Sequence, residues 1–274
     1  MENETYMKRL KDRLQIEFKK QDRSGVYGYT QRSMAYNSNR IEGSTLTEKQ
    51  TASMFETGTL YVDDPDMIFR TKDIEEMNGH FKMFNYVMKC MEKPLSEDII
   101  KNMHKNLKEG VFEDRANGYA IGGWKKRANR VSDIQTALPQ EVPEKIHQLL
   151  EKYHNAEKIT LYDIAKFHAQ FENIHPFQDG NGRVGRMIIL KQCLDHNIVP
   201  VIIRDIHKAE YNRYLNKAQH EQDYKGLEAY FEKEQKYYQE STIPMIFDFD
   251  ELFDLLVKTK FQISSLYMKD HGMT

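Results

Sequence analysis

Between residues 175 and 186 the chain carries side chains that could move a proton and bind a phosphate group. His175 is the only side chain of this stretch whose ordinary pKa suits it to accept a proton near neutral pH. Asp179 offers hard carboxylate oxygens, which are the ligands that Mg²⁺ prefers. The stretch therefore holds a candidate base and a candidate metal ligand within one short segment.

The second half of the stretch predicts an anion-binding site. Gly180 and Gly182 allow backbone N–H groups to turn toward a common point, and Asn181 tolerates the same conformations. Arg183 and Arg186 then follow on one face of an expected helix. Two cations at a helix N-terminus oppose its dipole, so phosphate binding explains them better than helix stability does. Together with the base, these parts describe group transfer from a magnesium nucleotide to an acceptor that the base deprotonates.

Two predicted helices hold this stretch at the joint between them. Thr160 is suited to cap the first helix, with Asp163 three residues on, and this helix is expected to end near Asn173. Apolar residues at helical spacing predict a second, largely buried helix from Arg183 to Leu194. The candidate site therefore lies where the first helix ends and the second begins.

The stretch resembles the signature of the Fic family, His-x-Phe-x-(Asp/Glu)-Gly-Asn-Gly-Arg-x-x-Arg, and every constrained position of that pattern is met. The related Doc-type kinases carry Ala-Asn-Lys where this chain has Gly180, Asn181 and Gly182, and this difference favours nucleotidyl transfer over kinase chemistry. The resemblance implies a mainly α fold, namely a Fic-type helical bundle with a small β-hairpin flap.

By the same resemblance, the activity is that of a protein adenylyltransferase. In the family, the base deprotonates a Ser, Thr or Tyr hydroxyl of a protein target, which attacks the α-phosphate of ATP; the chain itself is a possible target. ATP would be the substrate and Mg²⁺ the metal, with His175 as the base and Asp179 as the metal ligand. The residues expected to hold the phosphates are Gly180, Asn181, Gly182, Arg183 near the α- and β-phosphates, and Arg186 near the γ-phosphate.

A second motif lies near the N-terminus. Ser38, Glu42 and Gly43 match the family's inhibitory pattern, (Ser/Thr)-x-x-x-Glu-(Gly/Asn), in the position typical of the class with an N-terminal inhibitory helix. A glutamate bound to Arg186 would occupy the guanidinium that the γ-phosphate needs, so ATP would be misaligned for attack. Ser38 shares a helical face with Glu42 and could anchor that helix. Taken alone, the motif also fits a surface glutamate before a helix-ending glycine; the complete signature elsewhere favours inhibition.

Periodicity and turn residues predict helices over most of the chain. The further segments expected to be helical are 5–22, 29–41, 47–56, 71–91, 96–110, 143–153, two Tyr-rich segments after residue 210, and a final helix that follows a turn at Ser241 to Pro244. Thr47 with Gln50, and Ser96, are suited to cap two of these helices, and Gly25 and Gly28 are expected to interrupt the chain between the first two. We expect an N-terminal helical region over 1–92 with the inhibitory motif at 38–43, a Fic catalytic core over 93–240, and a C-terminal helical extension over 241–274.

Residues 111–139 have a different character. Glycines interrupt helical patterns there, and β-favouring residues predict a β-hairpin. In the family a hairpin flap at this point aligns the target segment by strand addition. The basic residues from Trp124 to Arg127, with Arg130, fit a solvated hairpin face better than a nucleic-acid site, and contact with an acidic target is an intermediate interpretation.

Several other residues that could do chemistry receive structural interpretations. His168 could join His175 and Asp179 in a metal site, but a packed side chain is the favoured interpretation. His104 is expected to be partly exposed and without a role. Cys90 and Cys193 are expected to be buried free thiols, since their spacing fits neither a disulfide framework nor a metal site.

Composition limits the partners, and it leaves other functions open. Forty basic and forty-two acidic residues give a formal net charge of −2, which argues neither for nucleic acid nor for an anionic membrane, and neither is expected as a partner. The N-terminal residues lack a signal-peptide pattern, so a cytoplasmic location is expected.

The signature stretch leaves other functions open. It could instead remove AMP from modified targets, transfer another phosphate-linked group, or bind nucleotide without turnover as a regulator. A metal-dependent phosphohydrolase would be marked by a firmly bound transition metal.

Overall fold

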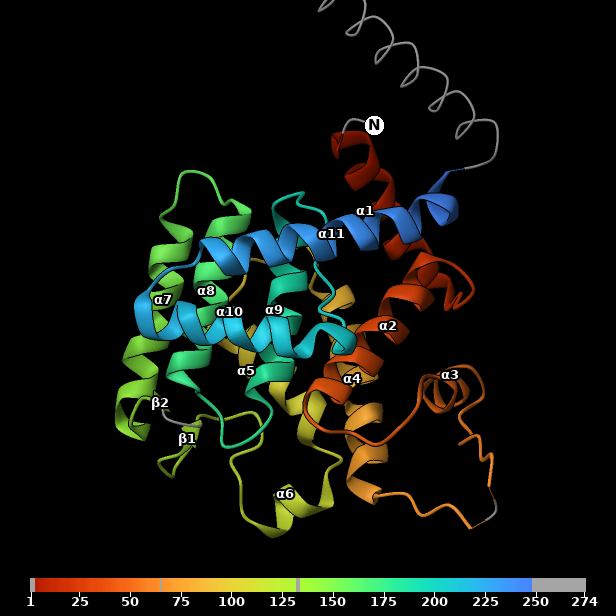
Figure 1. Cartoon of the computed structure of the whole chain (residues 1–274), viewed down its shortest axis with the longest axis horizontal. Coiled ribbons are helices and arrows are strands. Elements are labelled where there is room, and N and C mark those ends of the chain that lie inside the picture. Colours follow the sequence, from red (N-terminus) through yellow and green to blue (C-terminus); the bar gives the residue numbers. More distant parts are fainter. Residues whose placement is uncertain (1–2, 65, 132–133, 248–274) are drawn as a thin grey trace, which may run out of the picture.

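The computed structural model describes residues 3–64, 66–131 and 134–247. The described residues form helices and one two-stranded antiparallel sheet, so the mainly α fold is confirmed (Figure 1). The elements in chain order are α1 (Asn3–Lys20), α2 (Val26–Ile41), α3 (Glu48–Thr57), α4 (Thr71–Lys89), α5 (Glu97–Lys108), α6 (Phe112–Ala116), β1 (Arg130–Val131), β2 (Ile134–Gln135), η1 (Pro139–Glu141), α7 (Val142–His154), α8 (Leu161–Ile174), α9 (Asn181–Asp195), η2 (Asp205–His207), α10 (Lys208–Glu221) and α11 (Lys225–Ile246).

Helix α9, which follows the signature stretch, lies in the middle of the molecule and contacts α8, α5, α2 and α4 (Figure 1). Its apolar residues, such as Val184, Ile188 and Leu190, are buried on all sides of the helix. Polar residues such as Arg183, Arg186 and Lys191 are buried on it as well, so neighbouring helices cover the whole surface of α9. Because α9 is enclosed along its length, the side chains of its first turn are held against the neighbouring helices.

Three helices begin at the capping residues that the sequence predicts. In α3, Thr47 Oγ1 accepts a hydrogen bond from the Gln50 N–H at 3.2 Å, and the Gln50 side chain accepts from the Thr47 N–H at 2.8 Å. Thr160 and Asp163 form the same reciprocal pair at the start of α8. Ser96 caps α5. These contacts satisfy backbone donors that the first turn of a helix leaves unpaired, and they set where each helix starts.

Helix α2 begins at Val26, three residues before the predicted start at Tyr29. Gly28 therefore lies inside the helix, although the sequence pattern predicted a break there. The glycine permits a close approach, because a Cβ at this position would lie 1.9 Å from the carbonyl oxygen of Arg23. At the other end, Gly43 has a φ of 90°, which confirms the predicted left-handed residue after the helix.

The N-terminal helices share one hydrophobic core with the rest of the molecule. Leu10 of α1 and Tyr27 of α2 belong to the same cluster of buried side chains as Leu190 of α9. A smaller cluster lies around α3 and includes Met54 and Met77. The core is thus continuous across the expected boundary near residue 92, and the division into three regions stays a prediction.

The segment 111–139 contains the predicted hairpin in a shortened form. Strands β1 and β2 are two residues long each and pair antiparallel. Helix α6 and a series of turns occupy most of the segment before β1. In those turns Gly118 and Gly122 have φ angles of 67° and 73°, which are incompatible with extended strands.

Helix α11 runs across the molecule to α1, where Tyr6 Oη and Thr242 Oγ1 lie 2.7 Å apart (Figure 1). The turn predicted from Ser241 to Pro244 was wrong, because the helix continues to Ile246. Pro244 lies inside this helix, where it removes one helical hydrogen bond. The final helix expected after this turn lies outside the described residues. Neither α11 nor any other described helix has the length and apolar composition needed to cross a membrane.

Candidate functional site

The joint between α8 and α9 is fixed by its own backbone and side-chain contacts. His175 ends α8 in the left-handed conformation, with φ of 51°, and its N–H donates to the Phe171 carbonyl at 2.9 Å. Asn181 accepts from the Phe177 N–H at 2.8 Å and donates to the Phe177 carbonyl at 2.9 Å. The Asn181 side chain therefore holds the loop, and a phosphate here would meet the backbone N–H groups at the start of α9.

His175 is placed to act as a neutral base. Burial and the nearby charge of Lys125 lower the pKa of its imidazole to about 4. Nδ1 is buried and lies 3.8 Å from Glu172 Oε2, while 17% of the side chain stays exposed. Burial raises the pKa of Glu172 to about 8, so this neighbour is largely protonated near neutral pH. His175 is consequently uncharged near neutral pH and able to accept a proton.

Asp179 lies among cationic side chains. Its Oδ2 accepts from Lys108 Nζ at 2.8 Å, and its Oδ1 accepts from the Gly180 N–H at 2.7 Å. Burial alone would raise the pKa of this carboxyl, but Arg183 and Lys108 hold it well below its usual range. The side chain remains 35% exposed. It is therefore ionised and reachable from outside the bundle.

Lys108 and Glu76 belong to this site, although the sequence analysis missed both. The buried Lys108 ammonium contacts Glu76 Oε1 at 2.5 Å and Asp114 Oδ2 at 2.6 Å as well as Asp179. Glu76 Oε2 in turn lies 2.5 Å from Arg183 Nη1, so the guanidinium predicted to contact phosphates is already paired. The available signal was a stripe of buried polar residues at helical spacing on α4: Asp73, Glu76 and His80.

Arg186 is bound by the end of α2. Its Nε donates to Ser38 Oγ at 2.9 Å, and its Nη2 donates to the Ser38 carbonyl at 3.1 Å and to Glu42 Oε1 at 2.6 Å. Burial raises the pKa of Glu42, but Arg186 and Arg183 outweigh it, so the pKa is lowered. A Cβ at Gly182 would lie 2.3 Å from Glu42 Oε1, which shows how closely α2 approaches the first turn of α9. The structure thus brings Ser38, Glu42 and Arg186 together.

The histidines do not gather around a metal. His168 Nε2 lies 2.7 Å from Tyr211 Oη in the core, as expected for a packed residue. Within the described ranges, no group of three or more His, Cys, Asp or Glu side chains could hold a metal ion, so His168, His175 and Asp179 do not form such a site. Cys90 and Cys193 are buried and free, which confirms that prediction.

Two predictions near the hairpin were wrong. His104 was expected to be partly exposed, yet only 3% of it is, because it stacks on Phe177 beneath the signature loop. Lys125 was expected on a solvated face, yet its ammonium is buried and donates to Asn129 Oδ1 at 2.6 Å and Thr136 Oγ1 at 2.8 Å. Both side chains are buried by segments distant in sequence, which local patterns do not reveal.

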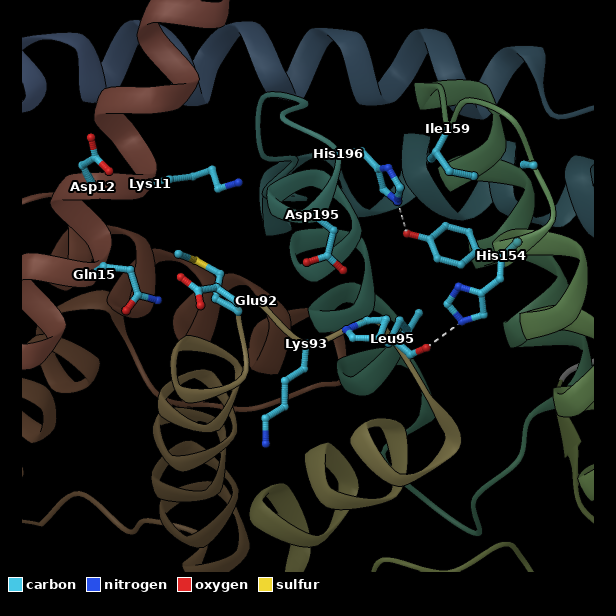
Figure 2. A pocket seen from close by; sticks show the side chains of 14 residues that line it. Lys11, Asp12, Gln15, Glu92, Lys93, Leu95, His154, Ile159, Asp195 and His196 are labelled. Carbon is cyan, nitrogen blue, oxygen red and sulfur yellow. Dashed lines mark hydrogen bonds between the residues drawn. The ribbon is translucent and has the colours of Figure 1, made fainter.

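A cavity of about 440 Å³ lies away from the signature loop, between α1, the α4–α5 connection, α7 and the C-terminal end of α9 (Figure 2). Both histidines that line it are hydrogen-bonded: His196 Nε2 lies 2.7 Å from Tyr153 Oη, and His154 Nε2 donates to the Leu95 carbonyl at 2.8 Å. None of the signature residues lines this cavity. The candidate catalytic groups therefore gather at the opposite, N-terminal end of α9.

Comparison with known proteins agrees with this geometry. The family model described as Fic/DOC matches residues 94–193, which include the whole signature stretch from 175 to 186. The chain belongs to the Fic/DOC family. Among curated relatives, the Fic/DOC chain is 26% identical over 188 residues to "Protein adenylyltransferase Fic" of Nematostella vectensis, covering 68% of this chain and 42% of the relative. It is 31% identical over 191 residues to the protein of that name from Drosophila erecta, covering 67% and 36%.

Solved structures show the same fold. A Fic domain containing signaling protein from Bacteroides thetaiotaomicron superposes with a TM-score of 0.71 at 21% identity, covering 89% of this chain and 97% of that one. Fic-1 from C. elegans gives a TM-score of 0.67 at 22% identity, covering 88% and 72%. The Fic/DOC chain spans less than half the length of the two curated relatives named above.

Proposed function

We propose that this Fic/DOC chain is a protein adenylyltransferase that transfers AMP from ATP to a hydroxyl of a target protein and is restrained by Glu42. The observation that carries the proposal is that two groups lie together at the N-terminal end of α9: the neutral imidazole of His175, and the guanidinium of Arg186, which is paired with Glu42. The names of the curated relatives, which are protein adenylyltransferases, support the same activity. A cytoplasmic location is part of the proposal.

In this mechanism, His175 accepts the proton of the target hydroxyl. Its Nδ1 is buried against Glu172, so Nε2 is the nitrogen left to face the acceptor. The hydroxyl oxygen forms a bond to the α-phosphorus of ATP as the bond to the departing pyrophosphate breaks. Arg186 and the backbone N–H groups at the start of α9 receive negative charge on the phosphates. The Arg183 guanidinium would also bind phosphate oxygens, while one side of it stays paired with Glu76.

Asp179 is the residue that would hold Mg²⁺. Its chemistry fits, because the carboxylate is ionised and partly exposed, and one carboxylate together with substrate phosphates is a usual set of magnesium ligands. When bound, the ion would neutralise charge on the phosphates. Lys108 Nζ donates to Oδ2 of this carboxylate and balances its negative charge.

Intact-mass analysis of a Glu42→Gly variant incubated with ATP and magnesium tests the proposal. Loss of the carboxylate frees Arg186, so we expect the protein, or an added target from a lysate, to gain the mass of one AMP residue. The same variant with His175→Ala is the control and should gain nothing. A folded Glu42→Gly protein that never transfers AMP would contradict the proposed activity, and a different mass gain would identify another transferred group.

A further inference from the structure

His104 of α5 uses both ring nitrogens to join two segments that are far apart in sequence. Its Nδ1 accepts a hydrogen bond from the Gly122 N–H at 2.9 Å, and its Nε2 donates to the Asp179 carbonyl at 3.1 Å. An imidazole that accepts at one nitrogen and donates at the other is neutral and has a single tautomer.

The His104 ring also packs against the signature loop. It stacks on Phe177 with the ring centroids 3.9 Å apart and the planes 1° from parallel. Trp124 packs on Phe177 as well, with centroids 5.2 Å apart. Phe177 is therefore held between α5 and the arm that leads into the hairpin, which comprises residues 117–129.

This arm is tied to the signature loop at successive points. The Lys125 N–H donates to the Pro176 carbonyl at 2.8 Å, and Asn129 Nδ2 donates to the Phe177 carbonyl at 3.0 Å. His104 extends the series to Asp179 and connects it to Gly122. The arm and the loop thus form one hydrogen-bonded layer, in which His104 lies nearest to the proposed magnesium ligand.

We propose that His104 is a positioning residue, which sets the direction of the Asp179 carboxylate by holding the Asp179 carbonyl and fixes the hairpin arm through Gly122. The proposal rests on the proposed function, because the direction of this carboxylate matters for transfer only if Asp179 binds the nucleotide's magnesium. Partners that orient a metal ligand typically contribute about 10- to 100-fold to affinity or activity. His104 touches neither nucleotide nor target in this assignment.

Two substitutions separate the two hydrogen bonds. The amide nitrogen of glutamine reaches the place of Nε2, so His104→Gln can still donate to the Asp179 carbonyl but cannot accept from Gly122. The amide oxygen of asparagine reaches the place of Nδ1, so His104→Asn keeps the contact with Gly122 and loses the one with Asp179. Both substitutions remove the stacked ring, so a difference between them reports the hydrogen bonds and not the packing on Phe177.

The variants are made in the Glu42→Gly background and followed by transfer kinetics. We expect His104→Asn to lower kcat by about 10- to 100-fold and to raise the magnesium concentration needed for half-maximal transfer. His104→Gln should retain most of the transfer at saturating magnesium. Equal losses in the two variants would overturn the proposal, because stacking alone would then explain the role of His104. His147, whose side chain is 68% exposed on α7, supplies the matched control: His147→Asn should change nothing.

Amide hydrogen exchange tests the same inference without any catalysis. His104→Asn should speed exchange in peptides that cover residues 176–183, and His104→Gln should speed it in peptides that cover 118–125. If neither region responds selectively, the positioning role is wrong, whatever the kinetics show. If Glu42→Gly transfers no AMP but exchange responds as expected, the proposed activity fails and the positioning of Asp179 by His104 stands.

Discussion

A single buried ammonium compensates three carboxylates beside the signature loop. Lys108 contacts Glu76, Asp114 and Asp179, and only Glu76 and Asp179 are also close to Arg183. Burial raises the pKa of Asp114 in spite of Lys108, whereas Arg183 and Lys108 outweigh burial at Glu76 and lower its pKa. Arg183 and Lys108 thus together keep Glu76 and Asp179 ionised, and Lys108 is the cation that contacts all three carboxylates.

We therefore predict that Lys108→Met destabilises the fold. Removing one partner of a buried ion pair leaves charges uncompensated and typically costs roughly 3–5 kcal/mol. Urea unfolding of the wild type and the variant at neutral pH measures this difference. Lys105→Met on the same helix is the control, because Lys105 is exposed, and it should change the free energy of unfolding by less than about 0.5 kcal/mol. Equal effects of the two substitutions would contradict the role of Lys108.

The residues of the site differ in how far the sequence predicted them. His175, Asp179 and the two arginines stand in one continuous motif, so local spacing was enough to find them. Lys108 and His104 were interpreted from their own helix alone, in which a charged or polar residue near the end normally faces water. Their burial depends on contacts with residues more than seventy positions away, such as Asp179, which no local pattern contains.

At the scale of elements, α2 is held firmly against α9. Asn39 Oδ1 lies 3.4 Å from Arg183 Nη1, and Ser38 and Glu42 bind Arg186. Asn37 Oδ1 accepts from the Asp205 N–H at 2.9 Å, which ties α2 to η2 as well. Several of these contacts do not involve Glu42. The proposed inhibitory contact therefore depends on the whole docked end of α2, and Glu42 supplies its negative charge.

From this arrangement we predict that Ser38→Ala partly relieves the restraint. The substitution removes the acceptor for Arg186 Nε but leaves the backbone carbonyl and Glu42 in place. A hydrogen bond to a charged group contributes about 1.5–3 kcal/mol, so the population with a free Arg186 should rise by about tenfold or more. AMP transfer should then lie between that of the wild type and that of Glu42→Gly.

Ser33→Ala, earlier on α2, is the control for this prediction and should transfer AMP at the wild-type rate. If Ser38→Ala also matches the wild type while Glu42→Gly is active, Ser38 does not contribute to holding the inhibitory contact.

Element boundaries were predictable where side chains close to one another in sequence set them. The capping pairs Thr47–Gln50 and Thr160–Asp163 formed as expected. The turn predicted near Pro244 was wrong, because α1 contacts α11 on both sides of the proline: Tyr6 contacts Thr242, and the Arg9 guanidinium lies 4.7 Å from the centroid of the Phe247 ring. The short hairpin follows from glycines with positive φ angles, whose conformations the strand pattern did not anticipate. Long-range packing thus decided the first case, and the local backbone conformation of the glycines decided the second.

At the scale of the whole molecule, buried neutral histidines surround α9. His80 of α4, His104 of α5 and His168 of α8 each have a pKa lowered to about 3, chiefly by burial, and His175 has a pKa lowered to about 4. The arginines of α9 add to this effect at His80 and His168. Folding therefore requires four imidazoles to stay uncharged, and this requirement links the stability of the core to pH.

We predict that stability falls steeply between pH 6 and pH 5. In the unfolded chain these imidazoles titrate near pH 6.5, so below this pH the unfolded state binds protons that the folded state does not bind. Each such group lowers the free energy of unfolding by about 1.4 kcal/mol for each pH unit below 6.5. Glu172 opposes one of them, because its pKa of about 8 lets the folded state hold an extra proton. The net expected slope is about 4 kcal/mol per pH unit, measured by urea unfolding at several pH values. His168→Asn removes one of these groups and should reduce the slope by about 1.4 kcal/mol per pH unit, while His147→Asn should leave it unchanged. Equal slopes for the wild type and both variants would contradict this account.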